Sequence, residues 1–87
     1  MSEALVKIMV EEINTCLLKS ALELEMSCDE KFTPKERDWH DEKWLKFESQ
    51  ARILRKCLRK YGVYPEIVYL KTVYEGYEFE VKQYKVP

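Results

Sequence analysis

The chain has 87 residues, of which 46% are hydrophobic and 36% are charged, with a formal net charge of -1. This composition excludes intrinsic disorder, and no run approaches the roughly 20 consecutive apolar residues that a membrane span needs. A balanced charge gives no general attraction to nucleic acid or to membranes, so any such binding depends on a local patch. The length predicts a single domain over residues 1–87 with a small core.

The N-terminus and the cysteines predict a cytoplasmic protein. The segment that begins at Met1 has neither the basic region nor the apolar region of a secretory signal. The chain contains three cysteines, which are Cys16, Cys28 and Cys57. An odd count without an export signal favours reduced thiols in a cytosolic compartment.

A first helix is predicted from Ser2 to about Cys28. No glycine or proline interrupts this segment, and Ser2 is suited to the N-cap. Apolar residues recur at steps of three and four, which predicts one buried stripe. The stripe consists of Val6, Val10, Ile13, Leu17, Ala21, Leu24 and Cys28. The charged residues are expected on the solvent face, namely Glu11, Glu12, Lys19, Glu23 and Glu25.

A second helix is predicted over about residues 34–61. Thr33 is placed as its N-cap, Pro34 as its first residue and Glu36 at the capping-box position. Gly62 is placed to end it, because glycine adopts the left-handed conformation without strain. Its apolar seam consists of His40, Trp44, Phe47, Ala51, Leu54, Leu58 and Tyr61. The short connector between the helices predicts an antiparallel αα-hairpin.

After the second helix, the pattern changes to alternation typical of strands. Residues of about 66–74 and 77–86 are rich in β-branched and aromatic side chains. Glu75-Gly76 fits a two-residue turn that pairs Tyr74 with Tyr77. The predicted fold class is therefore α+β, in which a long antiparallel αα-hairpin precedes a two-stranded antiparallel β-hairpin, in the order α-α-β-β.

The two faces of the predicted β-hairpin differ in character. We assign the face that holds Leu70 and Val81 to the helices, and the opposite face to solvent. On the solvent face, the predicted pairs include Lys71 with Glu80, a favourable cross-strand match of opposite charges. The apolar phase changes between Val81 and Tyr84, which predicts a bulge near Lys82-Gln83.

A lone two-stranded ribbon is marginally stable and leaves two open edges. The helices also carry more apolar residues than one seam needs, among them Ile8, Met9, Leu45, Ile53 and Cys57. A symmetric dimer would bury them by joining two ribbons into a larger sheet or by packing two helical hairpins into a bundle. A homodimer is therefore predicted, and the alternative is a monomer whose β-hairpin lies lengthwise over the helices.

The cysteines and His40 have the ligand types of a zinc site, but their spacing argues against one. His40 and Cys57 share a helix and lie about 25 Å apart along its axis. Cys16 and Cys28 lie about 18 Å apart on the other helix. No metal or cofactor is predicted, and the thiols are expected to act as small buried apolar groups.

His40 is the only histidine and the one candidate for a general base. Glu36 and Asp41 are near it in sequence, although Asp41 points to another face of the helix. No nucleophile and no glycine-rich phosphate loop accompany it. We therefore expect His40 to extend the helical seam or to lie at its polar end, and we predict that the chain is not an enzyme.

A basic stripe lies near the end of the second helix, formed by Arg52, Arg55, Lys56 and Arg59. Such a stripe could follow phosphates, with Tyr61 or Tyr64 stacked on a base. Two structural roles compete with binding: cations oppose the helix dipole at a C-terminus, and acidic residues of the first helix could neutralise them. These acids are Glu3, Glu11 and Glu12. Nucleic-acid or phosphate binding is therefore the alternative function.

Exposed aromatic and apolar residues favour a protein partner. Trp39 lies about 140° around the helix from Trp44, so it cannot share the seam. It is either an anchor for a partner or a cover for Phe32 and the connector. Tyr69, Val73 and Ile67 leave a second apolar strip on the solvent face of the ribbon.

The leading functional prediction is a small non-enzymatic protein–protein interaction module, an inhibitor or adaptor that acts by presenting a binding surface. Small inhibitors, antitoxins and phage accessory or anti-defence proteins have this general profile. That comparison is an analogy of class, since function depends on the site and not on the fold.

Overall fold

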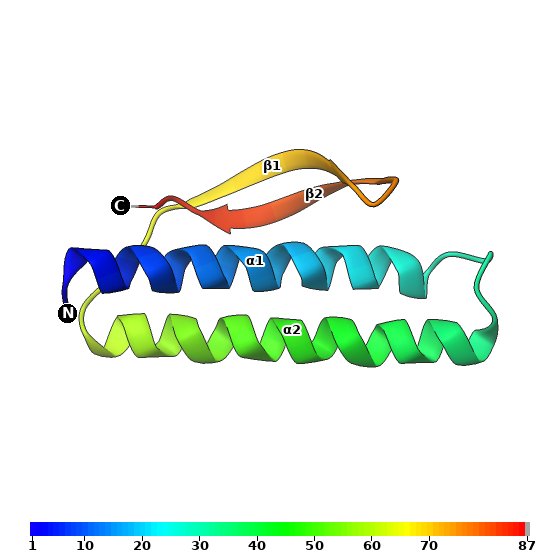
Figure 1. The fold of residues 1–87 in the computed structure, drawn as a ribbon, viewed down its shortest axis with the longest axis horizontal. Coiled ribbons are helices and arrows are strands. Elements are labelled where there is room, and N and C mark those ends of the chain that lie inside the picture. Colours follow the sequence, from blue (N-terminus) through cyan, green and yellow to red (C-terminus); the bar gives the residue numbers. More distant parts are fainter. Residues whose placement is uncertain (87) are drawn as a thin grey trace.

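Two long helices precede two paired strands in the computed structural model, which describes residues 1–86 (Figure 1). Helix α1 spans Glu3–Ser27 and helix α2 spans Pro34–Lys60. Strand β1 spans Ile67–Tyr74 and strand β2 spans Tyr77–Tyr84, and together they form one antiparallel sheet. The predicted α-α-β-β order is confirmed. Within the described residues, neither helix is long and apolar enough to cross a membrane.

Capping side chains begin both helices at the predicted residues. The hydroxyl of Ser2 accepts the backbone N–H of Leu5 at 3.2 Å at the start of α1. At the start of α2, Thr33 and Glu36 form a capping box, in which each side chain accepts the backbone N–H of the other residue. These bonds satisfy N–H groups that the first turn of a helix leaves without partners.

Glycine ends α2 as predicted. Gly62 has a φ of +76°, which turns the chain out of the helix. The N–H of Val63 then bonds to the carbonyl of Leu58 at 3.0 Å, which is the closing bond of a Schellman motif. The chain can therefore reverse direction within a few residues and return along the helices as β1.

A two-residue turn joins the strands and sets their register. Both of its residues are left-handed, with a φ of +52° at Glu75 and +82° at Gly76, as a type I′ turn requires. Tyr74 pairs with Tyr77 beside the turn, and the pairing continues to Ile67 with Tyr84. The predicted register is confirmed.

The bulge predicted near Lys82 and Gln83 is wrong, since both residues keep regular partners in β1. Val81 and Tyr84 are both buried although they lie on opposite faces of β2. The twist of the ribbon, and not an extra residue, therefore accounts for the irregular alternation of apolar residues. Two-stranded ribbons twist more than wide sheets do. The solvent face therefore turns toward α2 at the end of β2, where the hydroxyl of Tyr84 accepts a hydrogen bond from Arg55 at 3.1 Å.

Replacing Glu75 with asparagine is expected to raise the free energy of unfolding by about 0.5–1 kcal/mol. Glu75 is the only described non-glycine residue with a positive φ, and asparagine tolerates that conformation better than glutamate. Urea denaturation followed by circular dichroism measures the change. Glu75→Val is the opposing control, since a β-branched residue there is expected to destabilise the hairpin, and equal stability of the two variants contradicts the assigned turn.

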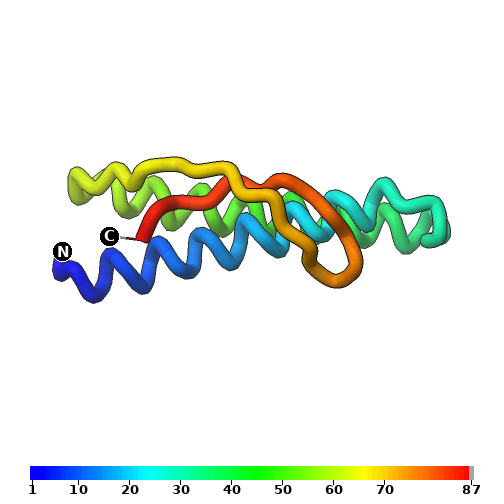
Figure 2. Tube along the Cα trace, turned by 90° about the horizontal axis from the view of Figure 1, so that it is seen from above, coloured from blue at the N-terminus to red at the C-terminus, as the bar shows by residue number. Residues whose placement is uncertain are grey.

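Strand β2 packs mainly on α1, with β1 beside it, and the ribbon lies on one side of the helix pair (Figures 1 and 2). The ribbon is held at both ends: Asn14 bonds to the backbone of Tyr84, and the hydroxyl of Tyr77 donates to the carboxylate of Asp29 at 2.6 Å. That bond is the main reason that the pKa of Asp29 lies below its ordinary value. Tyr77 to Tyr84 spans about 23 Å of strand, which matches the roughly 22 Å of helix from Asn14 toward Asp29.

Seen from above, the ribbon crosses the helices obliquely, starting over the end of α2 and reaching past α1 at its turn (Figure 2). The crossing leaves a groove between α2 and β2, lined in part by Leu24 and Trp44. Leu24 is therefore exposed, in contrast to its predicted place in the seam. Cys28 is also exposed, because it follows the last residue of α1.

The core lies where α1, α2 and β2 meet. Its buried apolar residues are Val6, Val10, Ile13, Cys16, Leu17, Ala51, Leu58, Val81 and Tyr84. Burial raises the pKa of the Cys16 thiol, so this residue behaves as a small apolar group. The core therefore contains most of the predicted stripe of α1 and a smaller part of the predicted seam of α2.

Candidate interaction site

The outer edge of β1 presents backbone groups without partners. In an antiparallel pair, hydrogen-bonded and non-hydrogen-bonded residue pairs alternate. The N–H of Lys85 donates to the carbonyl of Glu66 at 2.8 Å, which marks Glu66 and every second residue after it as facing β2. The residues between them direct their N–H and C=O groups away from β2, and these are Ile67, Tyr69, Lys71 and Val73. Within residues 1–86, no third strand covers that edge.

The outer edge of β2 is partly covered by α1. The side-chain amide of Asn14 donates to the carbonyl of Tyr84 and accepts its N–H, both at 2.8 Å, as a neighbouring strand would. Gln83 adds a bond from its side chain to the backbone carbonyl of Asn14 at 3.1 Å. The sequence predictions missed Asn14, whose only signal is a polar residue next to the buried stripe. β1 is therefore the strand with an open edge along its whole length.

The predicted apolar strip on the ribbon is exposed in part. Tyr69 and Val73 are 65% and 67% exposed, and they lie on the face opposite the helices. Ile67 is less exposed, and the twist of the ribbon turns it toward Arg55 and Tyr84 instead. The strip is bordered by charged residues of the same face, namely Lys71, Glu78 and Glu80.

Leu70 is exposed although it lies on the face assigned to the helices. Its exposed fraction is 50%, whereas its partner Val81 on β2 is buried. The reason is that α1 packs under β2 and does not extend below β1. The edge strand therefore exposes apolar side chains on both of its faces.

Trp39 is exposed and partly engaged within its own chain. Its ring lies 5.0 Å from the imidazole of His40, and the ammonium of Lys43 lies 4.1 Å from the centre of its indole. The ring of Phe32 lies tilted against the same imidazole, with 4.8 Å between the ring centres, so Trp39 and Phe32 both cover His40. Trp39 thus has a structural role beside its predicted role as an anchor.

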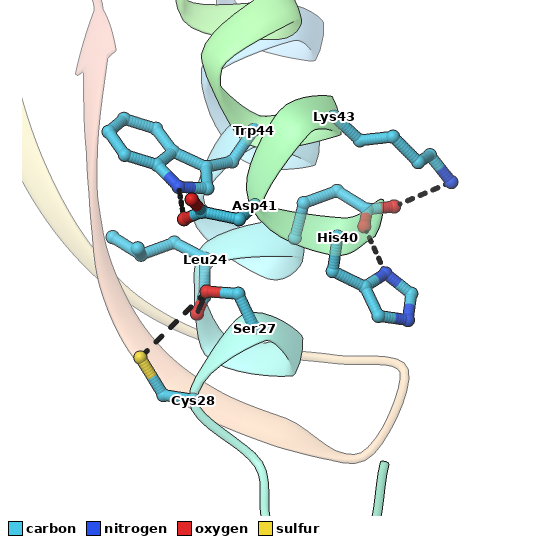
Figure 3. Close-up of polar contacts among 8 residues, drawn as sticks. Leu24, Ser27, Cys28, His40, Asp41, Lys43 and Trp44 are labelled. Carbon is cyan, nitrogen blue, oxygen red and sulfur yellow. Dashed lines mark hydrogen bonds and ion pairs between the residues drawn. The ribbon is translucent and has the colours of Figure 1, made fainter. Parts of the chain in front are cut away.

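His40 belongs to a buried polar cluster between the helices. His40 and Glu23 are each 7% exposed, and the Nδ1 atom of His40 lies within hydrogen-bond distance of the Glu23 carboxylate. Lys43 reaches the other carboxylate oxygen at 3.0 Å. Figure 3 shows His40 and Lys43 approaching this carboxylate from α2. Glu23 was predicted on the solvent face, and that prediction is wrong because it supplies the partner that the buried imidazole needs.

The carboxylates near His40 in sequence have other partners. Glu36 accepts the N–H of Thr33, and Asp41 accepts the indole N–H of Trp44 at 2.7 Å (Figure 3). The imidazole is covered by Trp39 and Phe32 and pairs with Glu23, so it has little access to a substrate. This arrangement has the character of a structural cluster, which joins the two helices at the end near the connector.

The cysteines are free and differ in their surroundings. Cys16 is buried, Cys57 is half-buried and Cys28 is exposed. Within residues 1–86, no group of three or more histidine, cysteine, aspartate or glutamate side chains is placed to hold a metal ion.

The residues of the predicted basic stripe differ in exposure. Arg55 is half-buried and donates to Tyr84, whereas Arg52, Lys56 and Arg59 are exposed. No ion pair joins the stripe to any described acidic residue, so Glu3, Glu11 and Glu12 make no direct contact with its charged groups. Arg55 and Arg59 line a small depression with Ile67 and Tyr84.

A further group of exposed apolar residues occurs on the helices, as the excess of apolar residues predicted. Ile53 is 67% exposed, and Leu5, Ile8, Leu45 and Tyr61 are exposed as well. None of these lies on the ribbon, so the helical surface is a separate place where a second chain could pack.

Comparisons with protein-family models, with curated proteins and with solved structures found no match to this chain.

Proposed function

We propose that this protein is a non-enzymatic protein-binding module that acts as a symmetric homodimer joined through β1. The observation that carries the proposal is the open edge of β1, which no proline, bulge or covering element protects within residues 1–86. Pairing two copies along this edge would complete the hydrogen bonds of β1 and place the exposed strips of both ribbons on one sheet face. An inhibitor or adaptor needs only such a surface.

The sequence of β1 pairs with itself well in one register. A two-fold axis at Leu70 places Leu70 beside its own copy, Tyr69 opposite Lys71, and Ile67 opposite Val73. This register directs all outward backbone groups at one another, which gives about eight hydrogen bonds. It contains no pair of like charges, whereas an axis at Lys71 would place two lysines opposite each other.

The sheet formed in this way has the layout of a protein interface. Tyr69 and Val73 of both copies lie near its centre, and Glu78 and Glu80 of β2 lie toward its margins. Recognition surfaces commonly combine an apolar centre with a polar rim, and tyrosine is enriched at their centres. The dimer therefore doubles an apolar strip that is small on one chain.

Replacing Lys71 with proline is expected to convert the dimer to a monomer. The N–H of Lys71 points away from β2, so proline removes a hydrogen bond of the dimer and none of the β1–β2 ladder. Lys71→Ala removes the same side chain but keeps the N–H, and it should remain dimeric. Light scattering at high micromolar concentration measures both masses, and a monomeric wild-type chain overturns the dimer.

The register itself is tested by disulfide formation. The chain for this test carries Cys28→Ser and Cys57→Ser, so that neither of these thiols can cross-link. In it, Leu70→Cys should form a covalent dimer on mild oxidation, because the Cβ atoms of directly opposite residues lie about 4.5–5.5 Å apart. Thr72→Cys is the control, since this register pairs it with Val68 of the second copy. Cross-linking at residue 72 but not at 70, or a dimer that cross-links through neither, contradicts the register and favours packing through the helices.

The binding face is tested by two variants of equal exposure. Val73 and Ile53 are both 67% exposed, on the ribbon and on α2 respectively. A partner recovered with the wild-type chain should be lost with Val73→Lys and retained with Ile53→Lys and Trp39→Ala. Loss with Ile53→Lys alone places the contact on the helices and contradicts the proposed face.

A further inference from the structure

A depression lies where the end of α2, the connector and the two strand ends meet. It has a volume of about 160 Å³. Its walls are Arg55 and Arg59 from α2, Val63, Tyr64 and Pro65 from the connector, and Ile67 and Tyr84 from the strands. The surface combines apolar side chains with two guanidinium groups, and no acidic residue lines it.

The polar groups of this depression are arranged as donors. Arg55 donates through Nη1 to the hydroxyl of Tyr84 at 3.1 Å, and this hydroxyl makes no other hydrogen bond within residues 1–86. Because the hydroxyl accepts from Arg55, its own proton remains available for donation. Arg59 contributes a second guanidinium with no carboxylate within ion-pair distance among the described residues. The depression therefore offers several donors to a ligand.

The backbone acceptors at the end of α2 are already occupied. The carbonyl of Leu58 accepts from Tyr61 and Val63, and the carbonyl of Arg59 accepts from Gly62. Glu66, the acid nearest in sequence to the depression, pairs with Lys85 at 3.3 Å. The cations are thus left without an internal counter-charge.

The helix dipole does not explain this arrangement by itself. A dipole effect is confined to the last turn, which holds Arg59 and Lys60. Arg55 lies more than a turn earlier and is fixed against Tyr84, a residue about 30 positions later in the chain. The pairing of Arg55 with Tyr84 therefore depends on the ribbon and shapes the depression.

We propose that this depression binds an oxyanion carried by a small apolar or aromatic group. A carboxylate or a phosphate monoester accepts hydrogen bonds from arginine in a geometry that the planar guanidinium matches. Val63, Pro65 and Ile67 would contact the apolar part of the ligand, and Tyr64 offers an aromatic face. Small-molecule sites commonly combine apolar walls with a few polar groups in this way. This site is distinct from the face of Tyr69 and Val73 that the proposed function uses.

Nuclear magnetic resonance titrations of the full chain test the site. Phenyl phosphate and benzoate are the two oxyanion probes, inorganic phosphate tests the anion alone, and benzyl alcohol is the neutral control. We expect the backbone signals of Val63, Tyr64 and Ile67 to shift with an aryl oxyanion and to remain unchanged with benzyl alcohol. The preferred probe distinguishes a phosphate ligand from a carboxylate ligand. No shifts with any oxyanion at roughly 10 mM overturn the proposal, since that limit corresponds to negligible affinity.

Two variants and a matched control show whether the assigned donors act. Arg59→Gln and Tyr84→Phe should each lower the affinity for the preferred probe. For Arg59→Gln, the affinity should fall by at least about tenfold, as expected for the loss of a charge-assisted hydrogen bond. Arg52→Gln removes an equal charge outside the depression and should change the affinity by less than about twofold because exposed charges are screened. Equal weakening by Arg52→Gln, or equal binding of benzyl alcohol, overturns the proposal.

A single-stranded oligonucleotide separates this site from the predicted nucleic-acid stripe. One result would overturn the small-ligand site and support the stripe: the oligonucleotide binds, the aryl oxyanions do not, and Arg52→Gln and Arg59→Gln weaken oligonucleotide binding equally. All titrations are repeated with Lys71→Pro. The same shifts in this variant show that the depression acts independently of the β1 dimer, so failure of one proposal is distinguishable from failure of the other.

Discussion

Replacing Glu23 with alanine is expected to lower the free energy of unfolding by about 3 kcal/mol, because it leaves the buried imidazole of His40 without its hydrogen-bond partner. The carboxylate uses both oxygens, one toward His40 and the other toward Lys43. Lys43 is partly exposed and can turn to water, whereas His40 remains buried without a partner. Urea denaturation followed by tryptophan fluorescence measures the loss, since the ring of Trp39 lies 5.0 Å from the imidazole of His40.

Two further variants identify the cause of that loss. Glu11→Ala removes an exposed carboxylate from the same helix and should change stability by no more than about 0.5 kcal/mol. Glu23→Leu combined with His40→Leu should recover much of the loss, because apolar residues can replace a buried pair at little cost. A Glu23→Ala protein as stable as the wild type contradicts a buried, paired carboxylate.

Replacing Asn14 with alanine is expected to lower the free energy of unfolding by about 2–3 kcal/mol. The reason is that it leaves the N–H and the C=O of Tyr84 without partners in a partly buried place. The end of β2 should then separate from α1, although the turn and its neighbouring pairs remain. Urea denaturation measures the loss of stability. Hydrogen exchange of the Tyr84 amide locates it, since this N–H donates to Asn14 at 2.8 Å.

Aspartate at this position separates the two hydrogen bonds. Asn14→Asp keeps an acceptor for the N–H of Tyr84 but loses the donor to its carbonyl, so it should destabilise at least as much as a single lost bond, about 1 kcal/mol. Thr15→Ala is the neighbouring control, because its hydroxyl bonds only to the carbonyl of Glu11 within the helix. If Asn14→Ala lowers the free energy of unfolding no more than Thr15→Ala does, the amide of Asn14 does not hold the ribbon against α1.

Local signals predicted the elements of this fold well. The capping box at Thr33 and Glu36, the end of α2 at Gly62 and the turn at Glu75-Gly76 each depend on residues within a few positions of one another. Short-range sterics and hydrogen bonds decide such features, so they can be read from the chain. The hydrophobic periods of 3.6 and 2 then assign the segments between them to helix or strand.

Features that depend on distant residues were predicted less well. Glu23 was predicted on the solvent face because a charged residue outside the apolar stripe of a helix is normally exposed. In the fold it is buried, because it pairs with His40 of the other helix. Leu70 was assigned to the core by alternation alone, which does not reveal that α1 covers only one of the two strands. The basic stripe was predicted from the helical spacing of α2 alone, which does not reveal the contact of Arg55 with Tyr84.

Short-range signals in the sequence are enough to predict the order and the pairing of the four elements, because each depends on propensity, capping and turn chemistry within a short segment. The sequence also predicted an open ribbon edge and the exposed Tyr69 and Val73. Tertiary packing determined which edge is the more open, since Asn14 covers the outer edge of β2 at Tyr84 and no third strand among residues 1–86 covers that of β1. It also decided where Arg55 and Arg59 point, because the twist of the ribbon brings Tyr84 onto α2. Both outcomes depend on contacts between residues far apart in the chain, whose geometry no local pattern contains.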